Sequence, residues 1–309
     1  MCIRDRYKPG KELFTLLDKL GSQSVPVHQV ILLNTEEKYF DQLIYGIRFL
    51  ETYQNIKVYH VSKREFDHGG TRRMGVKKSS ADVFVMMTQD AMPKDDRLIE
   101  KLVEPLQGEV AVAYARQLPR EDSTPVESYT REFNYPAKSR IKSAADLDSL
   151  GIKTFFCSNV CAAYRREIYE ELGGFVRHTI FNEDMIYAAK AVEAGYSVAY
   201  AADAQVVHSH NYTNGQQFHR NFDLGVSQAE HPEIFAAYPS ESEGKRMVKD
   251  VTVYLRSNHM SAGLPHFYMQ CACKYAGYLL GKNYRRLPKK WVLAFTSNKE
   301  YWKQNRKDV

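Results

Sequence analysis

Asp90 is a carboxylate in a position that suits a metal ion. It comes two residues after the apolar run DVFVMMT, which is typical of a strand, and Pro93 marks the start of the next predicted helix. One carboxylate at the end of a strand can help to hold Mg²⁺ or Mn²⁺ against a diphosphate, because hard cations often take only one or two protein carboxylates plus phosphate oxygens. The alternative is a turn aspartate that caps the next helix, and the local sequence supports both equally.

Two further segments carry candidates for proton transfer and metal binding. FNEDM places Glu183 and Asp184 at the start of a predicted helix, where the helix dipole alone also favours acids. In a functional interpretation, one of these carboxylates is a general base that takes a proton from an attacking hydroxyl. VVHSH places His208 and His210 at the end of a predicted strand. Either imidazole could complete a metal site, although a hydrogen-bonded structural histidine is the more common case.

The segment FDHGGTRRMG, residues 66–75, has residue types that suit a phosphate group. Its paired glycines let the backbone approach a ligand closely, and Arg72 and Arg73 offer positive charge at the opening of a helix. The segment is neither a P-loop nor GxGxxG, so the nucleotide-binding folds with those motifs lose support.

The elements that must position these residues alternate along the first two-thirds of the chain. Strands are predicted over residues 27–33, 56–61, 82–88 and 109–115, with helices over 36–50 and 95–106 between them. Residues 129–150 are an irregular or helical excursion. Helices over 165–172 and 183–194, a strand pair over 196–202 and 204–208, and only helices after about residue 214 complete the chain. This α/β alternation predicts a mostly parallel sheet with helices on both faces, whose ligands bind at the carboxyl ends of the strands.

Charge divides the chain unevenly. Its 309 residues are 44% hydrophobic and 26% charged, with a net charge of +6, which excludes a disordered or fibrous protein. Residues 245–309 hold 14 Lys and Arg against 3 Asp and Glu, so the rest of the chain is mildly acidic. A basic segment favours an anionic partner, and without a nucleic-acid-binding motif we expect no nucleic acid. A basic amphipathic helix on the headgroups of an anionic membrane and a helix packed on the main domain remain equal alternatives.

The expected cellular location of the protein follows from targeting features that the sequence lacks. No signal peptide and no long apolar stretch are visible, and five cysteines, an odd number, fit a reducing compartment. We therefore expect a cytoplasmic protein, with peripheral contact at the inner face of the cell membrane as the option that the basic segment opens.

Taken in order, six segments resemble those of a family 2 glycosyltransferase with the GT-A fold, and most closely those of bacterial rhamnosyltransferases. They are YKPG, FDHGGTRRMG, MMTQDAMP, FFCSNVCAAYRREIYEELGGF, FNEDMIYAAKAVEAGY and VVHSHNYT. The resemblance implies inverting transfer of a sugar, L-rhamnose from dTDP-L-rhamnose, to a hydroxyl of a cell-surface polysaccharide or a lipid-linked precursor. The implied cofactor is Mg²⁺ or Mn²⁺. The rival interpretations are a noncatalytic GT-A-like scaffold subunit, which the intact FNED segment opposes, and a nucleotidyltransferase, whose phosphate loop is not visible.

The resemblance also assigns roles to residues. Asp184 matches the catalytic base and Glu183 its companion on the acceptor side. Asp90 matches the last acid of a DxD-type metal motif, and His208 matches the late metal-ligand histidine, with His210 as the alternative. The residues implied to bind the nucleotide sugar are Tyr7, Glu36, Asp67, Arg72, Gln89, Asp90, Ser158 and Asn159.

The start of the chain departs from the family pattern. Family members begin with an apolar strand, whereas here MCIRDR is charged and lacks alternation. We therefore expect residues 1–6 to be a non-native leader and the central sheet to lack its first strand. The expected division is a catalytic domain over residues 7–240 and a basic amphipathic helical region over residues 241–309.

Overall fold

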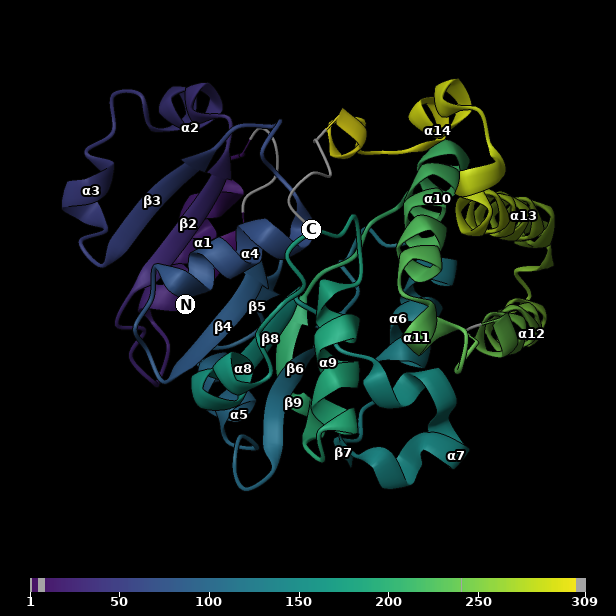
Figure 1. The fold of residues 1–309 in the computed structure, drawn as a ribbon, viewed down its shortest axis with the longest axis horizontal. Coiled ribbons are helices and arrows are strands. Elements are labelled where there is room, and N and C mark those ends of the chain that lie inside the picture. Colours follow the sequence, from purple (N-terminus) through teal and green to yellow (C-terminus); the bar gives the residue numbers. More distant parts are fainter. Residues whose placement is uncertain (1, 5–8, 240, 304–309) are drawn as a thin grey trace.

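A computed structural model describes residues 2–4, 9–239 and 241–303 of the chain. One sheet runs through the first two-thirds, with helices on both faces, and a group of helices follows at one side (Figure 1). The strands of the sheet are β1 (Cys2–Arg4), β2 (Val30–Thr35), β3 (Ile56–Val61), β4 (Val83–Thr88), β5 (Met92–Pro93), β6 (Val110–Leu118), β7 (Arg140–Lys142), β8 (Cys161–Arg165) and β9 (Ser197–Val207).

The helices fall into two sets. Those of the sheet region are α1 (Glu12–Gly21), α2 (Glu37–Ile44), α3 (Phe49–Thr52), α4 (His68–Lys77), α5 (Leu98–Val103), α6 (Pro125–Asn134), α7 (Leu147–Leu150), α8 (Arg166–Glu171) and α9 (Glu183–Glu193). Those that follow are α10 (Asn214–Glu230), α11 (Pro232–Phe235), α12 (Glu241–Ser257), α13 (Leu264–Lys282) and α14 (Lys289–Phe295). The expected helical end of the chain is therefore present.

The sheet is mixed rather than mostly parallel. Its order is β3-β2-β1-β4-β8-β6-β9-β5, with β7 also beside β9. The first four strands of this order are parallel, and so are β6 and β9, but β8 runs antiparallel to both of its neighbours. The reason is the long connection between β6 and β8, which ends at the carboxyl edge of the sheet. β8 therefore starts at that edge, and Cys161 at its start pairs with Met87 near the end of β4.

The prediction that the sheet lacks its first strand is wrong. Residues 2–4 form β1, which pairs in parallel with both β2 and β4 and closes the sheet between them. The segment lacks an apolar alternation, but a strand between two partners is also held by backbone hydrogen bonds, which do not depend on side-chain type. Two smaller differences concern continuity. The expected strand pair is one strand, β9, with an irregular register, and the expected helix over 36–50 is interrupted near Gly46, whose φ is 75°.

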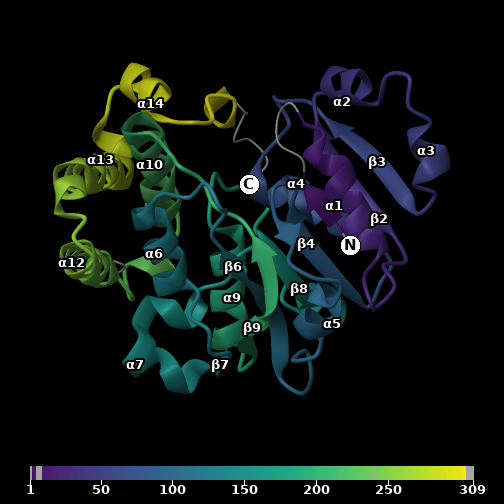
Figure 2. The same ribbon diagram turned by 180° about the vertical axis from the view of Figure 1, so that it is seen from behind.

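Helices cover the sheet on both faces. α4, α8 and α9 lie on one face (Figure 1), and α1 and α5 lie on the other, as the reverse view shows (Figure 2). The alternation in β4 explains this arrangement: Phe84 and Met86 belong to the buried cluster under the first set, and Val85 and Met87 to the cluster under the second. The two cores hold the carboxyl ends of the strands in fixed positions relative to one another.

The helices after the sheet pack on it and on each other. α10 lies along α13, and glycines on both helices allow close contact because the backbone of the other helix fills the space that a Cβ would need. Those glycines are Gly225, Gly277 and Gly281. A separate buried cluster joins Ile180, just before α9, to Phe222 of α10 and Tyr301 near the end of the described chain. Among the described residues, no helix has the length and apolar character needed to cross a membrane.

Candidate active site

A cavity of about 260 Å³ lies at the carboxyl edge of the sheet. Its lining comes from the ends of β4, β6 and β9, the loop before β8 and the start of α9. This cavity brings together eight of the residues that the sequence pointed to: Arg72, Asp90, Ser158, Asn159, Glu183, Asp184, His208 and His210.

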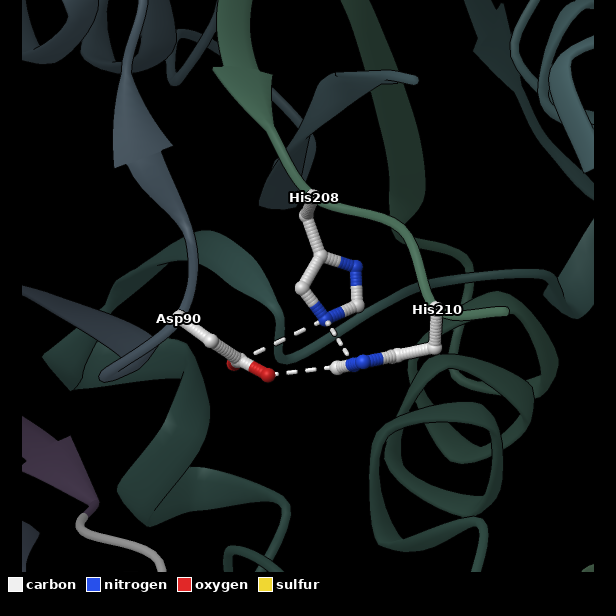
Figure 3. A group of neighbouring side chains, drawn as sticks. All are labelled: Asp90, His208 and His210. Atoms are coloured by element: carbon white, nitrogen blue, oxygen red, sulfur yellow. Dashed lines mark hydrogen bonds and ion pairs between the residues drawn. The ribbon is translucent and has the colours of Figure 1, made fainter. Parts of the chain in front are cut away.

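Asp90, His208 and His210 form a compact group of possible metal ligands (Figure 3). The Nε2 atom of His208 lies 3.6 Å from Asp90 Oδ1, and the Nε2 atom of His210 lies 3.0 Å from Asp90 Oδ2. The two Nε2 atoms are 3.2 Å apart. One ligand atom from each residue lies within 4.8 Å of the others, so a single ion could contact all three.

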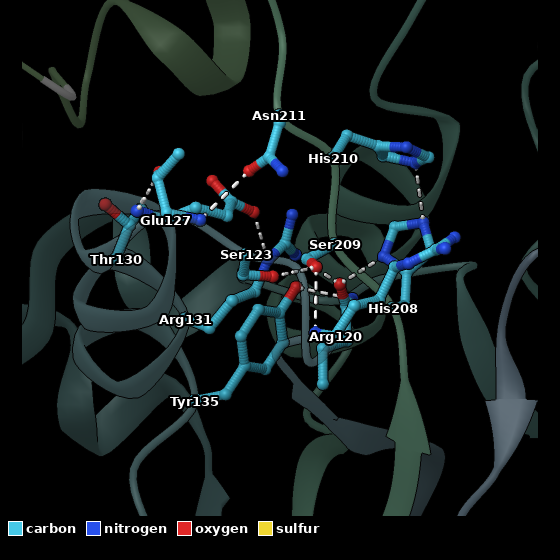
Figure 4. Close-up of polar contacts among 12 residues, drawn as sticks. Arg120, Ser123, Glu127, Thr130, Arg131, Tyr135, His208, Ser209, His210 and Asn211 are labelled. Carbon is cyan, nitrogen blue, oxygen red and sulfur yellow. Dashed lines mark hydrogen bonds and ion pairs between the residues drawn. The ribbon is translucent and has the colours of Figure 1, made fainter.

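Gln117, at the end of β6, fixes the tautomer of His208. Arg131 of α6 donates to Gln117 Oε1 at 2.5 Å, and His208 Nδ1 lies 2.9 Å from the same oxygen. Figure 4 shows Arg131 and His208 on the two sides of this group of polar contacts. Because Gln117 Oε1 accepts only, His208 Nδ1 must carry the proton and donate it. The lone pair of His208 is then on Nε2, the atom that faces Asp90 and His210.

The electrostatics of this group suit a cation. Burial lowers the pKa of His208 to about 4, against the opposite influence of Asp90, so His208 is neutral at ordinary pH. The lone pair of its Nε2 therefore faces the carboxylate of Asp90, and two acceptors at this distance favour a positive ion between them. Carboxylate and imidazole are both ordinary ligands of divalent ions such as Mn²⁺.

Asp184 lies in the same cavity, at the start of α9. Its Oδ2 accepts the backbone N–H of Asn159 at 2.8 Å, and its Oδ1 accepts the N–H of Met185 at 2.8 Å. Burial raises the pKa of Asp184 above the usual value of an aspartate, while Arg72 and these hydrogen bonds oppose the rise. A positioned carboxylate with a raised pKa is a better proton acceptor than an exposed one.

Glu183 is held by other side chains of the site. Its carboxylate is 2% exposed and pairs with Arg72. Asn159 Nδ2 also donates to it at 3.1 Å, and His68 Nδ1 lies 3.8 Å away. Since Asn159 also holds Asp184 through its backbone, Glu183 helps to fix the position of Asp184.

A second cavity, of about 550 Å³, adjoins the first. His68, Phe181, Tyr212 and Arg220 line both. The remaining lining comes from Ile180, from α10 and from residues 294–299, so the C-terminal region helps to form it.

Asp223 of α10 holds the C-terminal segment that lines this cavity in place. Its buried carboxylate accepts the hydroxyl of Thr296 at 2.6 Å and the N–H of Ser297 at 2.9 Å. His219 Nδ1, one turn earlier on α10, lies 2.7 Å from the carbonyl oxygen of Phe295. The second cavity is therefore built from α10 and a segment tied to it.

The likeness of the chain to known proteins now decides its family. Residues 14–173 match the model of glycosyl transferase family 2. The chain is 39% identical over 302 residues to the O-antigen chain rhamnosyltransferase RfbN of Salmonella typhimurium, covering 96% of this chain and 93% of that protein. It is 41% identical over 254 residues to the O-antigen chain rhamnosyltransferase WbaN of Salmonella anatum, covering 81% of this chain and 80% of that protein. The chain belongs to glycosyl transferase family 2.

A solved structure of another protein has a fold similar to that of this family 2 member. The mannosyltransferase PcManGT of Pyrobaculum calidifontis, solved in complex with GDP-Man and Mn²⁺, superposes with a TM-score of 0.60 at 15% identity, covering 91% of this chain and 86% of that one. At this identity the likeness shows the fold. The predicted GT-A fold, family and enzyme class, a glycosyltransferase, are therefore confirmed.

Some residues predicted to bind the nucleotide sugar lie outside the cavity of the family 2 enzyme. Asp67 caps α4 by accepting the N–H of Gly70 at 2.6 Å. Glu36 accepts the N–H of Lys63 at 2.6 Å, and Gln89 is not part of the cavity lining. Tyr7 lies outside the described residues.

Sequence reasoning missed Gln117, Arg131, Tyr135, Tyr212 and Arg220, which also line the cavity. Gln117 is on β6, Arg131 is on α6 and Tyr135 directly follows α6. The latter two fall within residues 129–150, for which the sequence predicts an irregular or helical excursion. The last two follow VVHSH within twelve residues, and an arginine so close to a histidine pair is the signal in the sequence that points to them.

Proposed function

We propose that this glycosyltransferase transfers L-rhamnose from dTDP-L-rhamnose, with inversion, to a hydroxyl of a cell-surface polysaccharide or a lipid-linked precursor. The names of the two Salmonella relatives support the sugar and the class of acceptor. The observation that carries the proposal is the cavity in which Asp184 and the Asp90, His208 and His210 group lie together.

In this proposal Asp90 and His208, with His210, hold a divalent cation, Mg²⁺ or Mn²⁺. The short distances among the three ligand atoms and the tautomer imposed by Gln117 support it. The cation would offset the negative charge that develops on the departing diphosphate. Arg72, Ser158 and Asn159 bind the donor from the cavity lining, and Tyr7, Glu36, Asp67 and Gln89 serve the nucleotide end of the same donor.

Asp184 is the proposed general base. It accepts the proton of the acceptor hydroxyl while that oxygen attacks the anomeric carbon of the donor sugar. A single carboxylate base and direct displacement predict inversion. Glu183 has a positioning role, because it holds Arg72 and Asn159, and Asn159 in turn holds Asp184.

The catalytic assignment is tested with Asp184→Asn. Asparagine keeps the shape and one acceptor oxygen but cannot take a proton at neutral pH, so we expect transfer to fall by roughly 10²- to 10⁴-fold while donor binding stays nearly intact. The purified enzyme is incubated with dTDP-L-rhamnose and other nucleotide sugars, and the released nucleotide is measured. Asp203→Asn, an exposed aspartate of β9, is the matched control. A variant as active as the wild type would contradict the assignment.

The pH profile gives a second measurement of the same base. A base works only when it is deprotonated, and burial raises the pKa of Asp184. As the pH is lowered, kcat/KM should therefore begin to decrease at a pH above the ordinary pKa of an aspartate. The Asp184→Asn variant should not show this decrease.

We also propose that residues 7–240, with the strand β1 in their sheet, are the catalytic domain and that the basic helical region, residues 241–309, contacts the anionic inner face of the cell membrane. Large apolar side chains are exposed on α13 and α14, namely Tyr268, Met269, Tyr275, Leu279 and Trp291. Lys289 and Lys290 directly precede Trp291. Exposed aromatics beside lysines are typical of helices that lie in the headgroup layer.

A further inference from the structure

A third cavity, of about 260 Å³, is lined by residues of β6, β7, β9, α7 and α12. Five of its described lining side chains are basic and one, Glu243, is acidic. We call it the basic cavity, after Lys138, Arg140, Lys142, Lys153 and Arg246. No described residue lines both this cavity and the active-site cavity, so the two are separate sites.

The sheet places cations and aromatic rings on one wall of the basic cavity. Arg140 and Lys142 are two residues apart on β7, so their side chains point to the same face. Arg140 is paired with Tyr200 of β9, and Tyr200 is paired with Tyr114 of β6. Because paired residues share a face, the cations of β7 stand beside the rings of β6 and β9.

Lys142 brings a buried positive charge to this wall. The residue is only 4% exposed. Its amino group donates to the carbonyl oxygens of Lys153 and Phe156, at 3.0 and 2.5 Å, and to the hydroxyl of Tyr114 at 3.3 Å. These oxygens are neutral, and within the described part of the chain no carboxylate forms an ion pair with Lys142. The charge is therefore held in place but not balanced.

The protonation of Lys142 reflects this missing counter-charge. Burial lowers the pKa of Lys142 to about 7, and the neighbouring Arg140 and Lys153 favour the same direction. A buried ammonium without a negative partner is costly, so part of it is neutral at neutral pH. An anion in the basic cavity would stabilise the charged form.

The other cations outnumber the carboxylates that pair with them. Arg140 pairs with Asp146 at 2.6 Å. Glu243 is shared between Lys153 at 2.5 Å and Arg246 at 3.2 Å. Two carboxylates therefore serve three cations, which leaves one positive charge in excess before the two remaining lysines of the cavity are counted.

The ring of Phe133 holds two of these cations in position. The Nζ atom of Lys153 lies 4.6 Å from the centre of that ring, and the central guanidinium carbon of Arg246 lies 5.0 Å from it. Arg246 and Lys138 are exposed, so a ligand that enters from the solvent can reach their N–H groups. A planar guanidinium donates paired hydrogen bonds to phosphate oxygens.

The size and charge of the basic cavity limit the class of ligand. Its volume is near the lower end of the range for small-molecule sites, roughly 300 Å³, so it suits a compact group rather than a whole glycan. The excess positive charge exceeds what a single carboxylate can balance. A phosphate group, with up to two negative charges and several acceptor oxygens, matches it better.

We propose that the basic cavity binds the phosphate group of a ligand other than the sugar donor, either a phospholipid headgroup or a soluble phosphate compound. Arg246 and Lys138 contact the phosphate oxygens, and Lys142 supplies positive charge from below without a hydrogen bond of its own. Binding is noncovalent and uses no residue of the active-site cavity. It therefore does not depend on the proposed function.

The test is a calorimetric titration of the whole protein with inorganic pyrophosphate, at low salt and with a chelator present so that no metal contributes. We expect the wild type to bind and Arg246→Gln to weaken binding roughly tenfold, because a charge-assisted contact is lost. Arg246→Lys keeps the charge and should retain most of the affinity. Arg256→Gln, at an exposed arginine of the same helix, is the matched control.

The buried charge is tested separately with Lys142→Met, which keeps an unbranched apolar side chain and removes the ammonium. It should also weaken pyrophosphate binding roughly tenfold, because the charge lies in a medium of low dielectric constant. Thermal unfolding shows whether the variant is folded. If it is not, Lys138→Gln, at an exposed lysine of the same cavity, takes its place.

A wild type that binds no pyrophosphate would overturn the inference. Binding that both Arg246→Gln and Lys138→Gln leave unchanged would do the same, because the pyrophosphate would then be bound elsewhere. Competition with a soluble short-chain phosphatidic acid distinguishes the two sources of the phosphate. Tighter binding of the phosphatidic acid assigns the basic cavity to a lipid headgroup, and tighter binding of pyrophosphate assigns it to a soluble compound.

Discussion

At the scale of single residues, the chemistry of the site depends on side chains that touch no proposed ligand. Gln117 is one of them, because its oxygen accepts from both Arg131 and His208 and so decides which nitrogen of His208 faces Asp90. Its amide nitrogen donates to Tyr135 and to Ser158 at 2.6 and 2.9 Å, which fixes the orientation of the amide. Partners of this kind hold a metal-binding histidine in its ligating form.

We predict that Gln117→Met lowers the affinity for Mn²⁺ by roughly 10- to 100-fold, because His208 loses the acceptor that sets its tautomer. Calorimetric titration of the metal measures this change. Gln107→Met, at an exposed glutamine after α5, is the control. Unchanged affinity in the Gln117 variant would show that the tautomer does not matter for metal binding.

The residues that sequence reasoning found and missed differ in a physical respect. Asp90, Asp184 and His208 follow or begin elements with strong apolar patterns, so their place at the sheet edge could be predicted. Arg131 lies on α6, a helix with no buried residue, so nothing in its own sequence shows that it approaches the site. Arg220 lines the cavity only because the fold brings α10 to the carboxyl edge of the sheet, and a placement of that kind cannot be seen in the local sequence.

At the scale of elements, the buried strands were the most predictable part of the fold. The expected strand over 56–61 coincides with β3, and the one over 82–88 differs from β4 by one residue. The direction of β8 was not predictable, because it depends on the path of the excursion between β6 and β8. β1 was missed because its partners, rather than its own side-chain pattern, make it a strand.

The contact between α10 and α13 is the element-scale feature most open to a test. A Cβ at Gly281 would meet the backbone of Phe222, and backbone cannot yield as a flexible side chain can. We predict that Gly281→Ala destabilises the protein by about 1–3 kcal/mol, measured by chemical denaturation. Gly244→Ala in α12 is the matched control, because a Cβ there meets nothing within 4 Å and alanine favours a helix. Equal stability of the two variants would mean that the helices can separate without cost.

At the scale of the whole molecule, the region that carries the excess positive charge also carries half of the large apolar side chains that are exposed among the described residues. The basic C-terminal region carries Tyr275 and Leu279 on one exposed face of α13, one turn apart. The opposite side of that helix contacts α10 through its glycines. The region therefore belongs to the fold on one side and is open to a partner on the other.

We predict that vesicles with anionic lipid sediment the wild-type protein at low salt and that Tyr275→Ser with Leu279→Ser reduces this binding roughly tenfold, because buried apolar area is lost. Higher ionic strength should weaken binding in both proteins. Tyr45→Ser, at an exposed tyrosine outside the basic helical region, is the control. Failure of the wild type to bind at low salt would remove the membrane from the proposal.

The glycine contact has a further consequence for geometry. The close contact at the glycines holds α13 against α10, and α10 carries Arg220 in the lining of the active-site cavity. A bilayer that receives the exposed face of α13 would thereby hold the reaction centre at a constant height above the lipid. The enzyme would then select its acceptor by distance from the membrane, because only a hydroxyl at that height could reach the reaction centre.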